Sequence, residues 1–162
     1  MAKNKSKLPS GIVIISFLLF LGLIGGIIKI FVNLKAYDIF TLFFDLLTLF
    51  VIVLALIGFK KRNPILYKLT ILFFFFYVLY SLYILIGNML EFENILYVIE
   101  DSSTVLFYFI VSYYLILRRK FFIKPGYHFN TKDKSYKKQE LFFKVTLAVI
   151  LLISLIVSFI NR

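Results

Sequence analysis

The stretch GIVIISFLLFLGLIGGIIKIFV, Gly11 to Val32, contains a single charged residue, Lys29. About 20 apolar residues in a helix are enough to cross the roughly 30 Å hydrocarbon core of a bilayer. The run is also too long for the apolar part of a secretory signal peptide, and no A-x-A cleavage site follows it. The stretch therefore predicts a membrane-spanning helix.

Apolar blocks of similar length recur along the whole chain. Hydrophobic residues make up 62% of the 162 residues, whereas about half is usual in a soluble domain. We expect an all-α integral membrane helical bundle that forms a single transmembrane domain, residues 1–162. Asn63 as a cap and Pro64 at the first helical position mark the start of its third helix. The five predicted transmembrane helices cover residues 11–32, 38–59, 64–87, 96–117 and 141–160.

In the predicted topology, lysine and arginine are distributed very unequally between the two sides of the membrane. All but three of the 19 fall on one side of the membrane, and many of them lie in a basic loop at 118–140. Cytoplasmic loops carry the excess of basic residues, so we expect a cell-membrane protein with a cytoplasmic N-terminus and an external C-terminus. The net charge of +11 then indicates contact with anionic lipid headgroups rather than with nucleic acid. The loop is polar and is expected to be mobile.

The residue inventory excludes several kinds of chemistry. The chain has no cysteine and one histidine, which excludes disulfides, thiolate metal sites and a His-rich metal site within one chain. It also has no H-E-x-x-H, Gly-x-Ser-x-Gly or P-loop motif. We therefore expect neither an enzyme nor a bound cofactor or metal.

One carboxylate, Asp45, lies in the middle of the apolar stretch Asp38–Phe50, within the second predicted helix. It would cost about 2.5–3.5 kcal/mol there, so a partner is expected. The short connection to the first helix makes the two helices antiparallel neighbours, with Lys29 about one turn nearer the outer surface than Asp45. Both side chains lean toward the N-terminus of their own helix and hence toward each other. The sequence predicts a Lys29–Asp45 ion pair beside a Gly22–Gly26 helix contact, with a snorkelling Lys29 as the alternative.

Polar residues also recur at helical spacing in the third and fourth predicted helices. Those in the outer half of the membrane are Ser81, Asn88, Asp101 and Thr104. If these stripes converge with the Lys29–Asp45 pair, they form a polar pocket open to the outside. The fifth predicted helix has few polar residues and is expected to be peripheral.

Two stretches, LPSGIVIISFLLFLG (Leu8–Gly22) and YYLILRRKFF (Tyr113–Phe122), resemble parts of a known family. It comprises small four-helix prokaryotic membrane proteins that open with a basic residue, Pro-x-Gly and an aliphatic run. The resemblance covers about the first 120 residues and leaves the fifth predicted helix outside. The turn FKKRNPILY lacks the tryptophan usual in that family. The family has no established activity, so the resemblance implies an architecture and no mechanism.

Two functions are compatible with these features. The polar residues can be interhelical hydrogen bonds that fix a small bundle with a structural or accessory role, within a larger membrane complex. Alternatively, Asp45 can serve an ion or small-solute transporter or channel that requires self-association. The expected partners are the lipid bilayer and either other membrane subunits or further copies of this chain.

Overall fold

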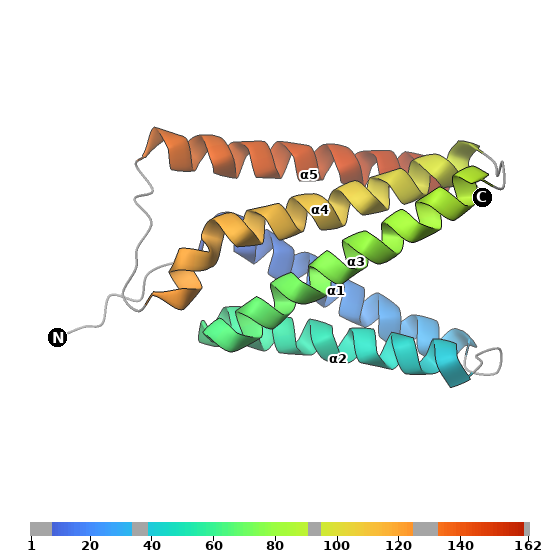
Figure 1. The fold of residues 1–162 in the computed structure, drawn as a ribbon, viewed down its shortest axis with the longest axis horizontal. Coiled ribbons are helices and arrows are strands. Elements are labelled where there is room, and N and C mark those ends of the chain that lie inside the picture. The colour runs from blue at the N-terminus through green and yellow to red at the C-terminus, as the bar shows by residue number, and fades with distance from the viewer. Residues whose placement is uncertain (1–7, 34–38, 91–94, 125–132, 161–162) are drawn as a thin grey trace. The chain divides into compact units, whose positions relative to one another are not determined.

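The computed structural model describes residues 8–33, 39–90, 95–124 and 133–160, and these residues are almost entirely helical. The helices are α1 (Ser10–Asn33), α2 (Ile39–Lys61), α3 (Pro64–Leu90), α4 (Ile95–Ile123) and α5 (Lys134–Ile160) (Figure 1). Each of the five is long and apolar enough to cross a membrane. The predicted all-α fold is confirmed, and five such helices fit a multi-pass membrane protein.

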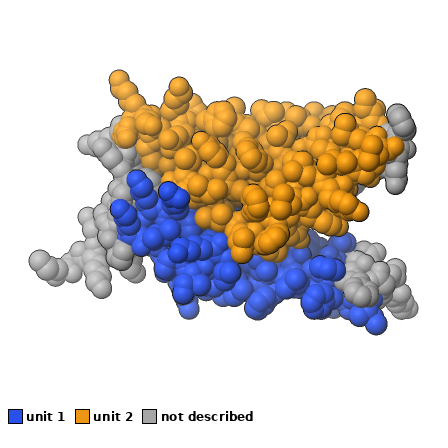
Figure 2. Space-filling view, in the orientation of Figure 1, with its two compact units in different colours: residues 1–70, 119–126 blue, residues 71–118, 127–162 orange. Residues whose placement is uncertain are grey.

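The chain divides into two compact units (Figure 2). Unit 1 comprises Met1–Thr70 and Arg119–Gly126, and unit 2 comprises Ile71–Arg118 and Tyr127–Arg162. Helices α3 and α4 therefore contribute to both units. In unit 1, α1 packs against α2, as the short connection between them predicts.

The turn between α2 and α3 follows the sequence signals. The Asn63 side-chain oxygen accepts hydrogen bonds from the backbone N–H groups of Ile65 at 2.9 Å and Leu66 at 3.2 Å, so Asn63 caps α3 as predicted. At the end of α2, Arg62 has a left-handed backbone with φ of 51°. The Asn63 N–H donates to the Gly58 carbonyl at 3.0 Å, which completes a Schellman-type helix end. Only Arg62 and Asn63 separate the two helices, so α3 begins directly after α2.

An aromatic cluster forms the core of unit 1 beside this turn. The rings of Tyr67 and Phe122 are stacked with centroids 3.9 Å apart, and Phe59 meets each of them edge-on or tilted at about 6 Å. All three side chains are buried. The Arg62 guanidinium lies 4.3 Å from the Phe121 ring centroid, which offsets part of the cost of its left-handed backbone.

The predicted ends of the last two helices are wrong. Helix α4 continues past residue 117 to Ile123, and α5 begins at Lys134 rather than at 141. Both ends of the predicted loop at 118–140 are therefore helical. Its central part, residues 125–132, lies outside the described residues.

The longer α5 has a defined start. The Asp133 carboxylate accepts a hydrogen bond from the Ser135 N–H at 2.9 Å, and its carbonyl accepts one from the Lys137 N–H at 3.1 Å. Asp133 therefore acts as an N-cap. Lys, Gln and Glu, which follow it, have good helix propensity although they are not apolar. Hydropathy alone places the start of this helix too late.

Candidate functional site

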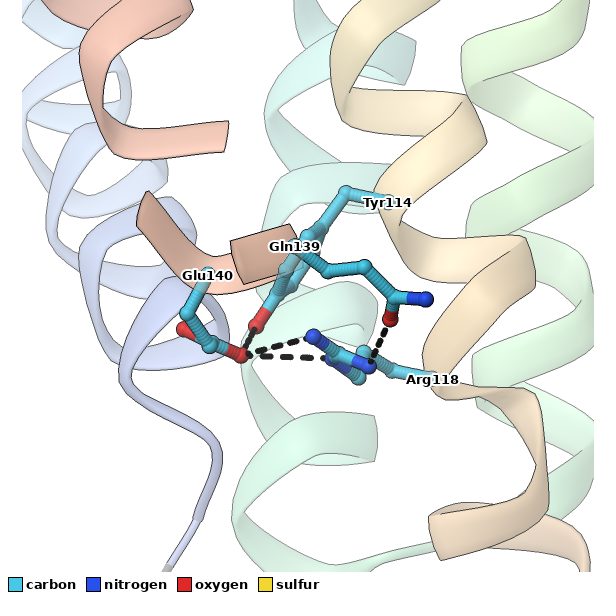
Figure 3. A network of polar contacts seen from close by, with 4 residues as sticks. All are labelled: Tyr114, Arg118, Gln139 and Glu140. Carbon is cyan, nitrogen blue, oxygen red and sulfur yellow. Dashed lines mark hydrogen bonds and ion pairs between the residues drawn. The ribbon is translucent and has the colours of Figure 1, made fainter. Parts of the chain in front are cut away.

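A network of four polar side chains connects α4 and α5 in unit 2 (Figure 3). Glu140 lies on α5 and accepts two hydrogen bonds at one carboxylate oxygen, Oε1, from the Tyr114 hydroxyl and from Arg118 Nε at 3.2 Å. Arg118 Nη2 lies 3.1 Å from the same oxygen in an ion pair. The remaining terminal nitrogen, Nη1, donates to Gln139 Oε1 at 3.0 Å. The guanidinium is thus bonded to two consecutive residues of the neighbouring helix.

The helical spacing of the residues positions this network. Tyr114 and Arg118 are one turn apart on α4 and so lie on the same face. The Tyr114 ring stacks on Phe143 of α5, with ring centroids 4.0 Å apart. The Arg118 guanidinium lies 5.0 Å from the Tyr114 ring and 4.5 Å from the Tyr136 ring. Cation–π attraction to both rings adds to the ion pair.

The network is enclosed by protein. The side chains of Arg118 and Glu140 are only 2% and 8% exposed. Burying either charge alone would be very unfavourable, and the direct ion pair with its extra hydrogen bonds offsets that cost. Because both charges are neutralised within the network, it is suited to fixing α4 against α5 in one register rather than to binding a substrate.

The Lys29–Asp45 contact lies in unit 1, between α1 and α2. The Lys29 ammonium is 3.0 Å from Asp45 Oδ2 and 3.4 Å from Oδ1, the contact that the sequence predicts. The two side chains are 56% and 27% exposed, so this pair is far more open than the one on α4 and α5. Lys29 is also only four residues from the end of α1 at Asn33, about 6 Å along the helix axis.

The two glycines predicted to form a helix contact beside this pair differ. A Cβ atom on Gly26 would lie 2.6 Å from the Leu49 side chain of α2, so Gly26 is at the α1–α2 contact. A Cβ atom on Gly22 would meet nothing within 4 Å. Gly22 is exposed and does not meet α2 within unit 1, so its packing against a neighbouring helix stays a prediction.

The predicted polar stripes of α3 and α4 face each other in unit 2. The Asn88 amide donates to Asp101 Oδ2 at 2.6 Å, and the rings of Tyr77 and Tyr108 lie 5.0 Å apart. Ser81 is buried, whereas the Thr104 hydroxyl donates to the Glu100 carbonyl of its own helix at 3.0 Å. Lys29 and Asp45 belong to the other unit, so the pocket that would join all six residues stays a prediction.

Helix α5 packs against α4 within unit 2, and its peripheral position in the whole bundle stays a prediction. Besides the Arg118–Glu140 network, the hydroxyls of Ser103 on α4 and Ser154 on α5 are 2.9 Å apart. Sequence reasoning missed this helix pair because it assigned Arg118 and Glu140 to a loop. One signal was available: Tyr136, Glu140 and Phe143 recur at spacings of four and three and so share a helix face.

Comparisons with known proteins add no family to this description. No family model, curated protein or solved structure matches the chain. Among the described residues, no group of three or more His, Asp or Glu side chains could hold a metal ion. The candidate site is therefore defined by the polar contacts between neighbouring helices.

Proposed function

We propose that this protein has a non-enzymatic structural or accessory role in the cell membrane, as a subunit of a larger membrane complex. The observation that carries the proposal is the pairing of polar side chains between neighbouring helices. Lys29 contacts Asp45, Asn88 contacts Asp101, and Arg118 contacts Glu140. Polar contacts of this kind fix helix packing in membranes.

The exposed surface supports association with lipid or with other helices. Large apolar side chains are exposed on every described helix, for example Phe31 at 76% and Phe159 at 83%. Such surfaces suit lipid tails and the apolar helices of partner subunits equally well. We propose the bilayer, with anionic headgroups at the basic helix ends, and other membrane subunits or further copies of this chain as partners. Nucleic acid is not among them.

Purification in a mild detergent after crosslinking in the membrane tests the proposal. A stoichiometric set of other membrane proteins is expected, and the Asp45→Leu/Lys29→Met double variant should retain it. A chain that purifies alone after efficient crosslinking would contradict the role as a subunit.

Transport by a homo-oligomer is the second candidate, and the exposure of Asp45 favours it. This carboxylate lies well inside an apolar helix and yet is 27% exposed despite its ion pair. Intramembrane carboxylates often serve ion pathways. Transport predicts a homo-oligomer whose proteoliposomes pass ions, and a folded but inactive double variant. The absence of flux in parent proteoliposomes would exclude it.

We also propose a cytoplasmic N-terminus and an external C-terminus. The chain has no cysteine, so introduced cysteines report topology cleanly. Leu90→Cys at the end of α3 should react with an impermeant thiol reagent in intact cells. Lys61→Cys at the end of α2 should react only after the membrane is permeabilised. The reverse pattern would invert the proposed orientation.

A further inference from the structure

A cavity of about 320 Å³ lies between α4 and α5 at the basic end of this helix pair. Its volume is at the lower end of the range for small-molecule sites. Residues of unit 2 line it, beside the Arg118–Glu140 network. Arg118 and Glu140 neutralise each other, so the net charge at the cavity is set by the residues that line it.

The lining changes from polar to apolar along the helices. Ser135, Lys138 and Gln139 line it from the first two turns of α5. Deeper in the apolar span, Ile110 of α4 and Phe142 of α5 line it. Ser135 and Phe142 are about 10 Å apart along α5, at 1.5 Å per residue. A phospholipid changes from a polar headgroup to an acyl chain in the same direction.

The polar end offers hydrogen-bond donors and a positive charge. Lys138 is exposed, and none of the salt bridges found among the described residues involves it. The Gln139 oxygen is held by Arg118, which turns its amide nitrogen away from the guanidinium (Figure 3). An ammonium and an amide N–H₂ beside a hydroxyl are complementary to a phosphate group.

We propose that this cavity binds one anionic phospholipid, with its phosphate at Lys138, Ser135 and Gln139 and part of an acyl chain against Ile110 and Phe142. Basic pockets between membrane helices commonly bind such headgroups. The site does not depend on the proposed role as a subunit. It requires only that α4 and α5 lie in a bilayer with their basic end at the headgroup level.

The test is lipid retention by the full-length protein, measured by native mass spectrometry in detergent with added phosphatidylglycerol or phosphatidylcholine of the same acyl chains. The parent should retain one phosphatidylglycerol and release phosphatidylcholine more readily. Lys138→Glu should weaken phosphatidylglycerol retention by about tenfold or more, because it removes one attraction and adds a repulsion. The matched control is Lys137→Glu, which has the same net charge but changes an exposed lysine outside the cavity lining. Retention of phosphatidylglycerol by this control variant should stay within about twofold of the parent.

A second variant tests whether the lipid occupies the cavity itself. Leu117 also lines the cavity, and Leu117→Trp should lower retention of both lipids by filling it. Equal loss in the Lys137 and Lys138 variants would mean diffuse surface attraction and overturn the site. Equal retention of both lipids, or displacement by millimolar inorganic phosphate, would overturn it as well. A dimer of this chain that the Leu117 variant disrupts would also overturn the lipid site. Circular dichroism and gel filtration exclude misfolding as the cause of any loss.

Discussion

The two ion pairs found among the described residues have nearly the same length and very different surroundings. Lys29 and Asp45 approach to 3.0 Å, and Arg118 and Glu140 to 3.1 Å. The first pair is 56% and 27% exposed and the second 2% and 8%. The distance between two charges therefore says little about how much the pair contributes to the stability of the fold. Burial and the number of further donors decide it.

The chemistry of the two cations adds to the difference. Lys29 is a flexible point charge near the end of α1, where a lysine side chain can also reach the membrane interface. The Arg118 side chain ends in a planar guanidinium, which donates hydrogen bonds to both Glu140 and Gln139 and lies close to two aromatic rings. Contacts with these four neighbouring groups fix its conformation. The α4–α5 contact should therefore resist disruption more than the α1–α2 contact.

The largest expected effect is the loss of one member of the buried pair. Glu140→Leu removes the carboxylate from beside a buried guanidinium, and Arg118→Met leaves a buried carboxylate without its cation. Either change should lower the free energy of unfolding by about 3–5 kcal/mol. Unfolding of the detergent-solubilised protein by heat or denaturant, followed by circular dichroism, measures this.

The double variant Arg118→Met/Glu140→Leu is the matched control. It removes both charges and keeps apolar volume, so most of the lost stability should return. Single variants within about 1 kcal/mol of the parent would show that burial does not distinguish the two pairs. A double variant as unstable as the singles would show that the Tyr114 and Gln139 contacts cannot tolerate an apolar replacement.

The Asn88–Asp101 contact, at the other end of unit 2, should have an intermediate effect on stability. Asn88 and Asp101 are both partly buried and joined by one hydrogen bond to a charged oxygen. Bonds to charged groups contribute about 1.5–3 kcal/mol, so Asn88→Leu should lower the unfolding free energy by about 2 kcal/mol. Thr104→Val is the control, because among the described residues the Thr104 hydroxyl bonds only its own helix. Equal effects of the two changes would remove the link between interhelical pairing and stability.

How far the sequence predicts these contacts depends on the connection between the helices. The short connection between α1 and α2 makes them neighbours at a known depth, and the Lys29–Asp45 contact follows from simple arithmetic. The Arg118–Glu140 contact could not be predicted in that way. Basic residues lower the hydropathy at the end of α4 and the start of α5 while keeping good helix propensity. The sequence pattern therefore assigns Arg118 and Glu140 to one loop.

The five helices themselves were predictable because each contains an apolar block of membrane length. Which glycines lie at a helix contact was harder to predict. Gly22 and Gly26 share one face by spacing, but only Gly26 meets a neighbouring side chain, that of Leu49. Spacing identifies a face of a helix and does not fix how far along that face the neighbouring helix stays close.

The exposed pair should have a small effect. Lys29 lies about one turn from the end of α1, where the pair can reach water at the membrane surface. Asp45→Asn or Lys29→Met should then lower the unfolding free energy by about 1 kcal/mol or less, the range for water-exposed pairs. Raising the salt concentration should weaken this difference, whereas the Arg118–Glu140 difference should persist. Stability of the four variants at low and high salt measures both. Losses of several kcal/mol for Asp45→Asn would mean that the pair is shielded in the membrane, by a partner subunit or another copy of the chain.

The smallest effects are expected at the glycines of α1. Gly22→Ala places a methyl group in open space and should raise stability by up to about 1 kcal/mol through helix propensity. Gly26→Ala gains the same propensity, but its methyl group must displace the tip of Leu49, so the net change should be within about 0.5 kcal/mol of zero. The difference between the two variants isolates the packing cost at the Lys29–Asp45 contact. If Gly22→Ala destabilises more than Gly26→Ala, then Gly22 faces a helix of another molecule, and the more open of the two ion pairs belongs to an intermolecular interface.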